Sequence, residues 1–246
     1  MTVERIETGI EGFDELIEGG FPRKSCILLS GMPGTGKTIF GLQYLCHGAS
    51  NGEKGLYVTF EQNMDDLISN VGAFEWGIPA LMDTGNLELL SMDIGEFKID
   101  ELVKKVKEEG HKRIVLDSLS TILSHPKILE EIDMSYMFVD KLDRLIPTIT
   151  DINIATRFIV YNTVKKIKSL DCTTLITSEL LMDSKSLSRD TISEFLADGV
   201  ITLQYIMSGV DTGRNLMIRK MRSTKHSENI HPIEFRKGAG FSVLMP

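Results

Sequence analysis

The sequence predicts an α/β protein with a mostly parallel central sheet, flanked by helices and continued by antiparallel strands at its C-terminal end. Three observations support this fold class. A glycine-rich loop stands between an apolar run and a helical pattern at residues 25–49. Apolar runs then alternate with helical patterns up to residue 179, and residues 199–244 contain mainly strand-like runs. Parallel strands covered by helices and followed by antiparallel strands form a mixed sheet.

Length and composition are those of a soluble globular protein. The 246 residues are 42% hydrophobic and 25% charged, and this length allows one large domain with an ample core. We find no linker, repeat or low-complexity segment and predict a single domain over residues 1–246. No apolar run approaches the roughly 20 residues that span a bilayer, and the first residues lack the features of a signal peptide.

Cysteine usage and net charge indicate the cellular compartment and the kinds of partner. Three cysteines lie in apolar stretches without metal-ligand spacing, which predicts buried thiols in a reducing, cytoplasmic environment. The net charge of −8 disfavours broad non-specific binding to nucleic acid or to anionic membranes. A local basic patch is compatible with that balance.

The elements follow from periodicity and from turn residues. Glycine-rich turns surround one short helix in residues 7–22. Strands are predicted at residues 25–30, 56–60, 87–90, 113–118, 172–178, 199–205, 214–222, 231–235 and 240–244. Helices are predicted at residues 39–49, 64–76, 99–109, 131–147 and 155–170, and the polar residues 184–190 are expected to be mobile.

Residues 31–38 read G-x-x-x-x-G-K-T, the pattern of a phosphate-binding loop. Glycines let successive amide groups converge on an anion, and the following helix adds its positive N-terminal end. Lys37 is predicted to reach the β- and γ-phosphates of ATP, and Thr38 to place its hydroxyl on Mg²⁺. The predicted nucleotide-binding residues here are Gly31, Pro33, Gly34, Thr35, Gly36, Lys37, Thr38 and Ile39. A chance glycine-rich turn is disfavoured because motif, strand and helix agree.

Carboxylates follow two of the predicted strands, at the edge where such sheets bind ligands. Glu61 comes after the strand at 56–60 and is a candidate general base for an attacking water; the alternative is a solvated loop acid. Asp117 ends an apolar run in a Walker B pattern, which predicts a Mg²⁺ ligand. Residues 177–179 are either sensors of the γ-phosphate or ordinary polar groups at a strand end.

Several segments together resemble the KaiC-like branch of the RecA/DnaB-type P-loop ATPases, in particular single-domain KaiC-type proteins. They are residues 10–14, 19–22, 31–38, 58–61, 116–118 and the run K-M-R-S-T-K-H at 220–226. The resemblance spans nearly the whole chain and implies a RecA-like fold and a ring, typically a hexamer, with ATP between subunits. It implies that Lys37, Thr38, Glu61 and Asp117 act from one subunit.

The resemblance also implies residues that act in trans on the neighbouring subunit's ATP. They are Lys220 and Arg222, as catalytic cations, together with Thr224 and His226. A cation near the γ-phosphate offsets charge that develops during transfer. Read without the resemblance, the same run is a solvated charged hairpin.

Two departures from the family pattern bear on activity. Gln62 stands where the family often has a second acid, so Glu61 acts alone and hydrolysis is expected to be slow. Counted from Asp198, the phosphoacceptor positions of the two-domain clock relatives fall on Glu194 and Phe195, which disfavours autokinase activity. With one P-loop and no long tail, a complete oscillator is not expected.

We therefore predict a Mg²⁺-dependent ATPase that self-associates and has a regulatory or signalling role with an unidentified protein partner. One alternative is a DNA-binding motor or recombinase, but residues 184–190 offer only Lys185 and Arg189 and no aromatic side chain for stacking. Nucleic acid and membrane are accordingly not expected partners. The other alternative, suggested by Gln62, is an ATP-gated scaffold with little turnover.

Overall fold

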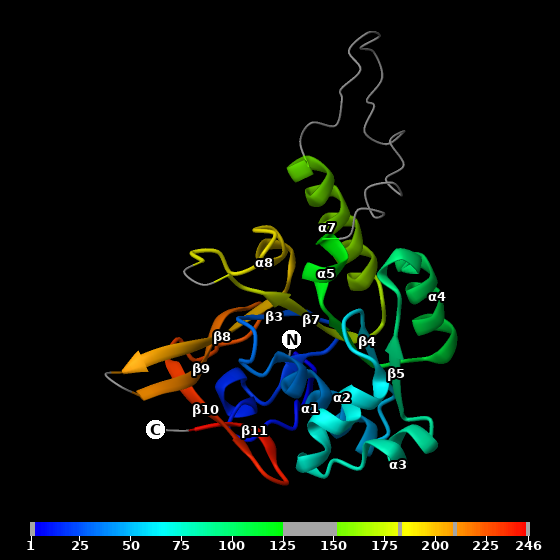
Figure 1. Cartoon of the computed structure of the whole chain (residues 1–246). Helices are drawn as coiled ribbons and strands as arrows, with labels where there is room; N and C mark the ends of the chain where they lie inside the picture. Colours follow the sequence, from blue (N-terminus) through cyan, green and yellow to red (C-terminus); the bar gives the residue numbers. More distant parts are fainter. Residues whose placement is uncertain (1–2, 125–151, 182–183, 209–210, 245–246) are drawn as a thin grey trace.

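The fold is built on one nine-stranded sheet, seen edge-on in Figure 1. The computed structural model describes residues 3–124, 152–181, 184–208 and 211–244. The strand order is β11-β10-β9-β8-β3-β7-β6-β4-β5. The strands from β8 to β5 in this order are parallel, and β9, β10 and β11 continue the sheet antiparallel. The predicted fold class is therefore confirmed.

The bounds of the strands are β3 Cys26–Gly31, β4 Gly55–Thr59, β5 Leu87–Ser91, β6 Arg113–Asp117, β7 Thr173–Glu179, β8 Gly199–Ser208, β9 Asp211–Met221, β10 Ile230–Arg236 and β11 Gly240–Val243. A separate two-stranded sheet, which the sequence did not predict, joins β1 Arg5–Ile6 to β2 Phe21–Pro22.

The bounds of the helices are α1 Lys37–Ser50, α2 Met64–Val71, α3 Ile78–Asp83, α4 Ile99–Glu109, α5 Leu119–Ser124, α7 Ile152–Lys168 and α8 Ser193–Leu196. Short 3₁₀ turns are η1 Asp14–Ile17, η2 Gly72–Phe74 and η3 Ile94–Glu96. No helix in the described part of the chain is long and apolar enough to cross a membrane.

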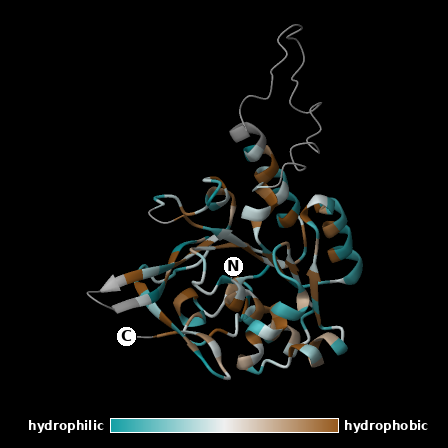
Figure 2. Ribbon diagram, in the orientation of Figure 1, coloured by the Kyte–Doolittle hydropathy of each residue, from teal (hydrophilic) through white to brown (hydrophobic). Residues whose placement is uncertain are grey.

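Alternating residues of the central strands feed two apolar cores, one on each face of the sheet. In β3, Ile27 and Leu29 join the core that contains α1, whereas Cys26 and Leu28 join the core that contains α4 and α7. This two-residue alternation is the natural pattern of a strand buried on both faces. Helix α4 carries both teal and brown residues in Figure 2, as an amphipathic helix does, and its Leu102 and Val106 belong to the second core.

Several predicted helices differ from those observed, and local backbone geometry explains why. The helix predicted at 64–76 stops at Val71, because the chain turns through a 3₁₀ segment and then through left-handed residues at Glu75 and Gly77. The short helices α3, α5 and α8 were not predicted. The helix predicted at 131–147 lies outside the described residues.

The polar segment at 184–190, expected to be mobile, is partly packed. Ser188 is buried and its hydroxyl donates to the carboxylate of Glu194, which is itself buried. Asp190 accepts from the backbone amides of Ile192 and Ser193, and these bonds tie the segment to α8. Sequence polarity alone does not distinguish such internally bonded loops from solvated ones.

A buried arginine joins the N-terminal segment to the base of the sheet. Arg113 is only 3% exposed and lies 2.6 Å from a carboxylate oxygen of Glu53. Its Nη1 donates to the backbone oxygens of Glu7 and Tyr44, both at 2.9 Å. The guanidinium also lies 4.8 Å from the centre of the Tyr44 ring.

Replacing this arginine should destabilise the fold. We expect Arg113→Met to lower the free energy of unfolding by about 3 kcal/mol, because it removes the buried partner of two carbonyl groups and leaves Glu53 with only the longer contact to Arg23 at 3.3 Å. Urea denaturation of purified protein measures the change. The control is Lys112→Met, since Lys112 is exposed and makes a distant pair of 3.8 Å with Asp171. Equal stability of the two variants would contradict the assignment.

Candidate nucleotide-binding site

The loop at residues 31–38 links β3 to α1 at the C-terminal edge of the parallel strands. Gly34 and Gly36 have φ angles of 76° and 106°, which favour glycine. A side chain at Gly36 would also meet Phe235 at 2.6 Å. Within the loop, the Thr35 hydroxyl donates to the Met32 carbonyl at 2.7 Å. The backbone is thus curled in the way that an anion-binding nest requires.

The Lys37 side chain folds back over this loop. Its Nζ donates to the carbonyls of Gly31 at 2.9 Å and Met32 at 3.2 Å. Burial lowers the pKa of Lys37, while the carboxylates of Asp117, Glu179 and Glu61 act in the opposite direction. The ammonium therefore lies among the three carboxylates that end β4, β6 and β7 or directly follow them.

Asp117, at the end of β6, is held by hydroxyl groups from three other elements. Thr38 donates to Oδ2 at 3.0 Å and Tyr57 to the same oxygen at 2.5 Å. Thr177 donates to Oδ1 at 2.5 Å. Burial and the nearby Asp117 charge raise the pKa of Tyr57, so its phenol remains protonated and keeps donating.

These oxygen atoms suit a magnesium ion. Mg²⁺ is usually held by one or two carboxylates, phosphate oxygens and retained waters, and the Thr38 hydroxyl and the Asp117 carboxylate already lie in contact. The two predicted metal ligands are therefore brought together. Thr177 has a contact with Asp117 that the sequence reading, which considered it as a γ-phosphate sensor, did not anticipate.

Glu61 lies two residues beyond the end of β4 and faces the segment after β6. Its Oε1 accepts from the hydroxyls of Ser118, at 3.3 Å, and Thr121. Those two hydroxyls lie 2.8 Å from each other. The carboxylate is thus oriented by two hydroxyls that follow β6, although the residue is exposed. Next to it, the Oε1 atom of Gln62 is buried without a hydrogen-bond partner among the described residues.

Ser178 and Glu179 lie at the end of β7 on the same edge. The Glu179 amide donates to the Ser120 hydroxyl at 2.9 Å, and the Glu179 carboxylate lies 3.4 Å from Arg189. The Ser178 hydroxyl accepts from the Arg189 amide at 3.2 Å. Pairing of β7 with β3 places both residues level with Ser30 and Gly31 at the start of the loop, but these contacts assign them no role in sensing phosphate.

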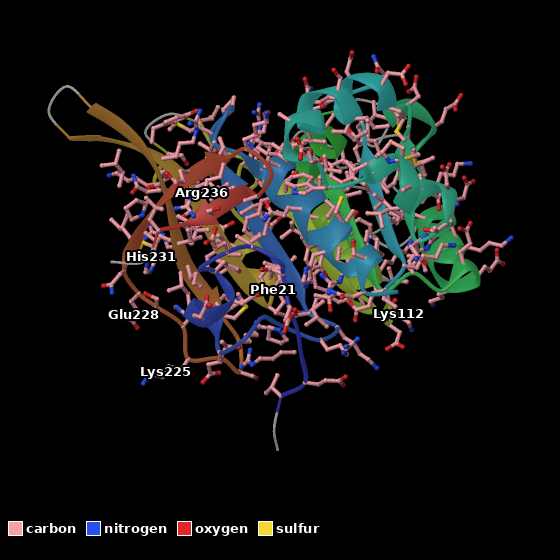
Figure 3. All side chains as sticks on the ribbon, turned by 90° about the horizontal axis from the view of Figure 1, so that it is seen from below. Phe21, Lys112, Lys225, Glu228, His231 and Arg236 are labelled. Atoms are coloured by element: carbon pink, nitrogen blue, oxygen red, sulfur yellow. The ribbon has the colours of Figure 1, made fainter. Side chains whose placement is uncertain are left out.

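The four residues expected to act in trans lie at the opposite ends of the strands, where the parallel strands begin. Met221 pairs with Gly199, which pairs with Ile27, four residues before Gly31. At about 3.3 Å per residue, that level is roughly 13 Å from the end of β3. Figure 3 shows Lys225 and Glu228, in the segment between β9 and β10, projecting into solvent. The four residues expected to act in trans therefore do not converge on the phosphate-binding loop of their own chain.

Within one chain, these residues have other partners. Lys220 Nζ donates to the carbonyls of Glu194, Phe195 and Ala197 at 3.1, 3.2 and 2.6 Å, around the end of α8. Arg222 pairs with Asp198 at 3.2 Å. The remaining two make separate contacts: the Thr224 hydroxyl accepts from Arg5 at 3.0 Å, and His226 Nδ1 lies 3.0 Å from the Ser227 carbonyl.

Two residues that the sequence reading missed support the loop from β8 and β9. The Tyr205 hydroxyl and Arg214 Nε both donate to the Gly34 carbonyl, at 2.8 and 3.2 Å. The Arg214 guanidinium also lies over the rings of Tyr205 and Phe235, 5.4 and 4.9 Å from their centres. No local motif marks these residues, because the contact joins positions about 170 to 180 residues apart.

The chain is similar to known proteins of one family. The family model described as "ATPase: KaiC" matches residues 6–246. A circadian clock oscillator protein KaiC from Prochlorococcus marinus is 31% identical over 94% of this chain, and the match covers 43% of that protein. The chain thus spans less than half the length of the curated KaiC proteins it matches.

Two further relatives match over nearly their whole length. A UPF0273 protein from Thermotoga maritima is 29% identical, with 94% of this chain and 93% of that protein covered. Among solved structures, a KaiC-like protein from the hyperthermophilic archaeon Pyrococcus horikoshii has a TM-score of 0.80 and 31% identity. That alignment covers 99% of this chain and 100% of the other.

The Arg214 contact can be tested by nucleotide binding. We expect Arg214→Met to weaken the binding of a fluorescent ATP analogue by about tenfold, because a charged hydrogen bond to the loop is lost together with a nearby positive charge. Fluorescence anisotropy with Mg²⁺ present measures the affinity. Arg236→Met is the control, because Arg236 pairs with Glu11 and Glu234 and not with the loop. Unchanged affinity in the Arg214 variant would refute its supporting role.

Proposed function

The chain belongs to the KaiC ATPase family, and we propose that it binds ATP with Mg²⁺ and hydrolyses it at residues 31–38. The observation that carries this proposal is the group of contacts on Asp117. Hydroxyls of Thr38, Tyr57 and Thr177 orient its two carboxylate oxygens beside the curled loop. Phosphoryl transfer relies on positioning and charge stabilisation, and this arrangement provides both.

The loop residues bind and orient the triphosphate. The loop amides and the N-terminus of α1 donate hydrogen bonds to phosphate oxygens. Lys37 gives up its hydrogen bonds to the carbonyls of Gly31 and Met32 and donates to the β- and γ-phosphates instead. Thr38 and Asp117 would hold Mg²⁺, the latter directly or through water. Held there, Mg²⁺ would supply positive charge that offsets the charge developing on the phosphate oxygens during transfer.

Glu61 is the residue proposed to act on water. Its carboxylate, fixed by Ser118 and Thr121, orients the attacking water or takes its proton. The neighbouring Gln62 carries an amide, which is no base, so a second acid is lacking at that position. Slow turnover is therefore expected.

A second subunit completes the proposed site. Lys220, Arg222, Thr224 and His226 would contact the neighbour's nucleotide in a ring, which we take to be a hexamer. Their position at the sheet edge opposite their own loop supports action in trans, because a head-to-tail ring brings opposite edges together. Lys220 would leave the carbonyls at the end of α8 when it binds the neighbour's ATP. A regulatory or signalling role, a cytoplasmic location and a single domain over residues 1–246 remain parts of the proposal.

Removing the proposed base separates binding from chemistry. We expect Glu61→Gln to lower the rate of phosphate release by about 100-fold or more, while ATP affinity changes little, because the amide cannot take a proton. Phosphate release and nucleotide anisotropy on the same sample measure the two quantities. The control is Glu101→Gln, an exposed residue of α4. A wild-type rate in the Glu61 variant would remove it from the mechanism.

The trans arrangement predicts complementation between two inactive proteins. Lys37→Ala lacks the loop lysine and Arg222→Ala lacks the proposed trans cation, and each should lose nearly all activity. In an equimolar mixture, roughly a quarter of the interfaces of a head-to-tail ring pair an intact loop with an intact arginine. We expect about that fraction of wild-type activity. Mixed oligomers that stay inactive would argue against trans catalysis.

The amide of Gln62, which is no base, also favours a second candidate function, that of an ATP-gated scaffold with little turnover. A single-turnover experiment distinguishes the two. Bound radiolabelled ATP that is recovered intact after hours supports the scaffold, whereas conversion to ADP within minutes supports the ATPase. The DNA-motor alternative has no supporting observation among the described residues. It predicts binding of single-stranded DNA at low salt, which a gel shift detects.

A further inference from the structure

A histidine and two glutamates meet at the edge of the sheet opposite the nucleotide loop. Glu88 is the second residue of β5, Glu109 ends α4, and His111 lies between α4 and β6. At this end of the strands, Gly55 at the start of β4 pairs with Leu87 of β5 on one side and with Arg113 of β6 on the other. Lys112, which follows His111, marks this edge in Figure 3. The cluster is therefore separate from the Asp117 site at the other ends of the strands.

His111 is buried without satisfying its ring nitrogens. Its side chain is 0% exposed, and neither Nδ1 nor Nε2 has a hydrogen-bond partner among the described residues. Nε2 nevertheless lies 3.3 Å from a carboxylate oxygen of Glu88 and 3.9 Å from one of Glu109. Burying a polar group without a partner is costly, so a ligand that engages Nε2 would stabilise this region.

From this geometry we infer that Glu88, Glu109 and His111 form a binding site for a divalent transition-metal ion, of which Zn²⁺ is the best example. One ligand atom from each of the three residues lies within 4.8 Å of the others. Imidazole nitrogen and carboxylate oxygen are both ligands of zinc, and a water can supply the fourth position. An ion bound tetrahedrally at about 2.0–2.1 Å holds its ligand atoms roughly 3.4 Å apart, so ligand atoms separated by up to 4.8 Å must draw closer. The two glutamates are partly exposed and can move.

Two lysines already neutralise the carboxylates. Lys105 Nζ lies 2.8 Å from Glu88 and 2.6 Å from Glu109, and Lys54 lies 3.3 Å from Glu109. The lysines satisfy the glutamates but leave the imidazole without a partner. A metal ion would engage all three groups and would displace the Lys105 ammonium, whose flexible stem lets it turn to solvent. Lys105 is therefore a competitor for the site.

Binding at this site would tie together three segments of the sheet edge. Glu88 belongs to β5, the last strand of the sheet, and the other two ligands flank the turn from α4 into β6. The expected role is structural, because an ion bound by the folded state and not by the unfolded state raises the melting temperature. This inference does not depend on the proposed ATPase activity.

The test is a titration of metal-stripped, nucleotide-free protein with Zn²⁺, followed by calorimetry and thermal unfolding. We expect a single zinc ion per chain and a zinc-dependent rise in Tm. Glu88→Gln and His111→Gln should each weaken zinc binding by about tenfold or more and abolish the rise. If His111→Gln does not fold, the partly exposed Glu88 provides the decisive variant.

Lysine variants supply an effect in the opposite direction. Lys105→Met should tighten zinc binding because it removes the competing ammonium. The control is Lys104→Met, which should leave zinc binding unchanged, because Lys104 lies on α4 and pairs only distantly with Glu108 at 3.9 Å. Asp117→Asn excludes zinc held at the nucleotide site and should bind zinc as the wild type does. Absence of zinc binding in both the wild type and the Lys105 variant, or equal binding in the Glu88 variant and the wild type, overturns the inference.

Discussion

The candidate site depends on one carboxylate held by three hydroxyl groups. Asp117 ends β6, and its partners come from α1, β4 and β7. Those partners reach it only because β6 lies between β4 and β7 in the sheet, with α1 packed across the strands. Strand order, rather than any loop by itself, therefore sets the orientation of the predicted metal ligand.

The same sheet separates two kinds of cation. Lys37 lies at the edge where the parallel strands end, and Lys220 and Arg222 lie where they begin. An antiparallel return of β9 along β8 is what carries the latter pair to the far edge. A chain built in this way cannot bring both sets to one nucleotide by itself, which is the geometric basis for proposing shared sites between copies.

The sequence predicted the fold class and the family correctly, because the main signals are local. The loop motif, its flanking strand and helix, and the apolar run before Asp117 can each be read within a dozen residues. The supports of the site cannot be read in this way. Tyr57 reads as an ordinary strand residue, and Arg214 reads only as the start of a strand, yet both act through contacts distant in sequence. The short helices α5 and α8 were not predicted because they are only 6 and 4 residues long and show little helical periodicity.

The contact of Lys37 with its own loop has a consequence for recognition. The ammonium bridges the carbonyls of Gly31 and Met32, so the curl of the backbone is held before any anion arrives. In the proposed binding step, the ammonium exchanges these two carbonyl oxygens for phosphate oxygens, and because the loop is already curled, little chain entropy is lost. Selectivity in that step would therefore favour anions whose oxygens are better acceptors for the ammonium than two peptide carbonyls.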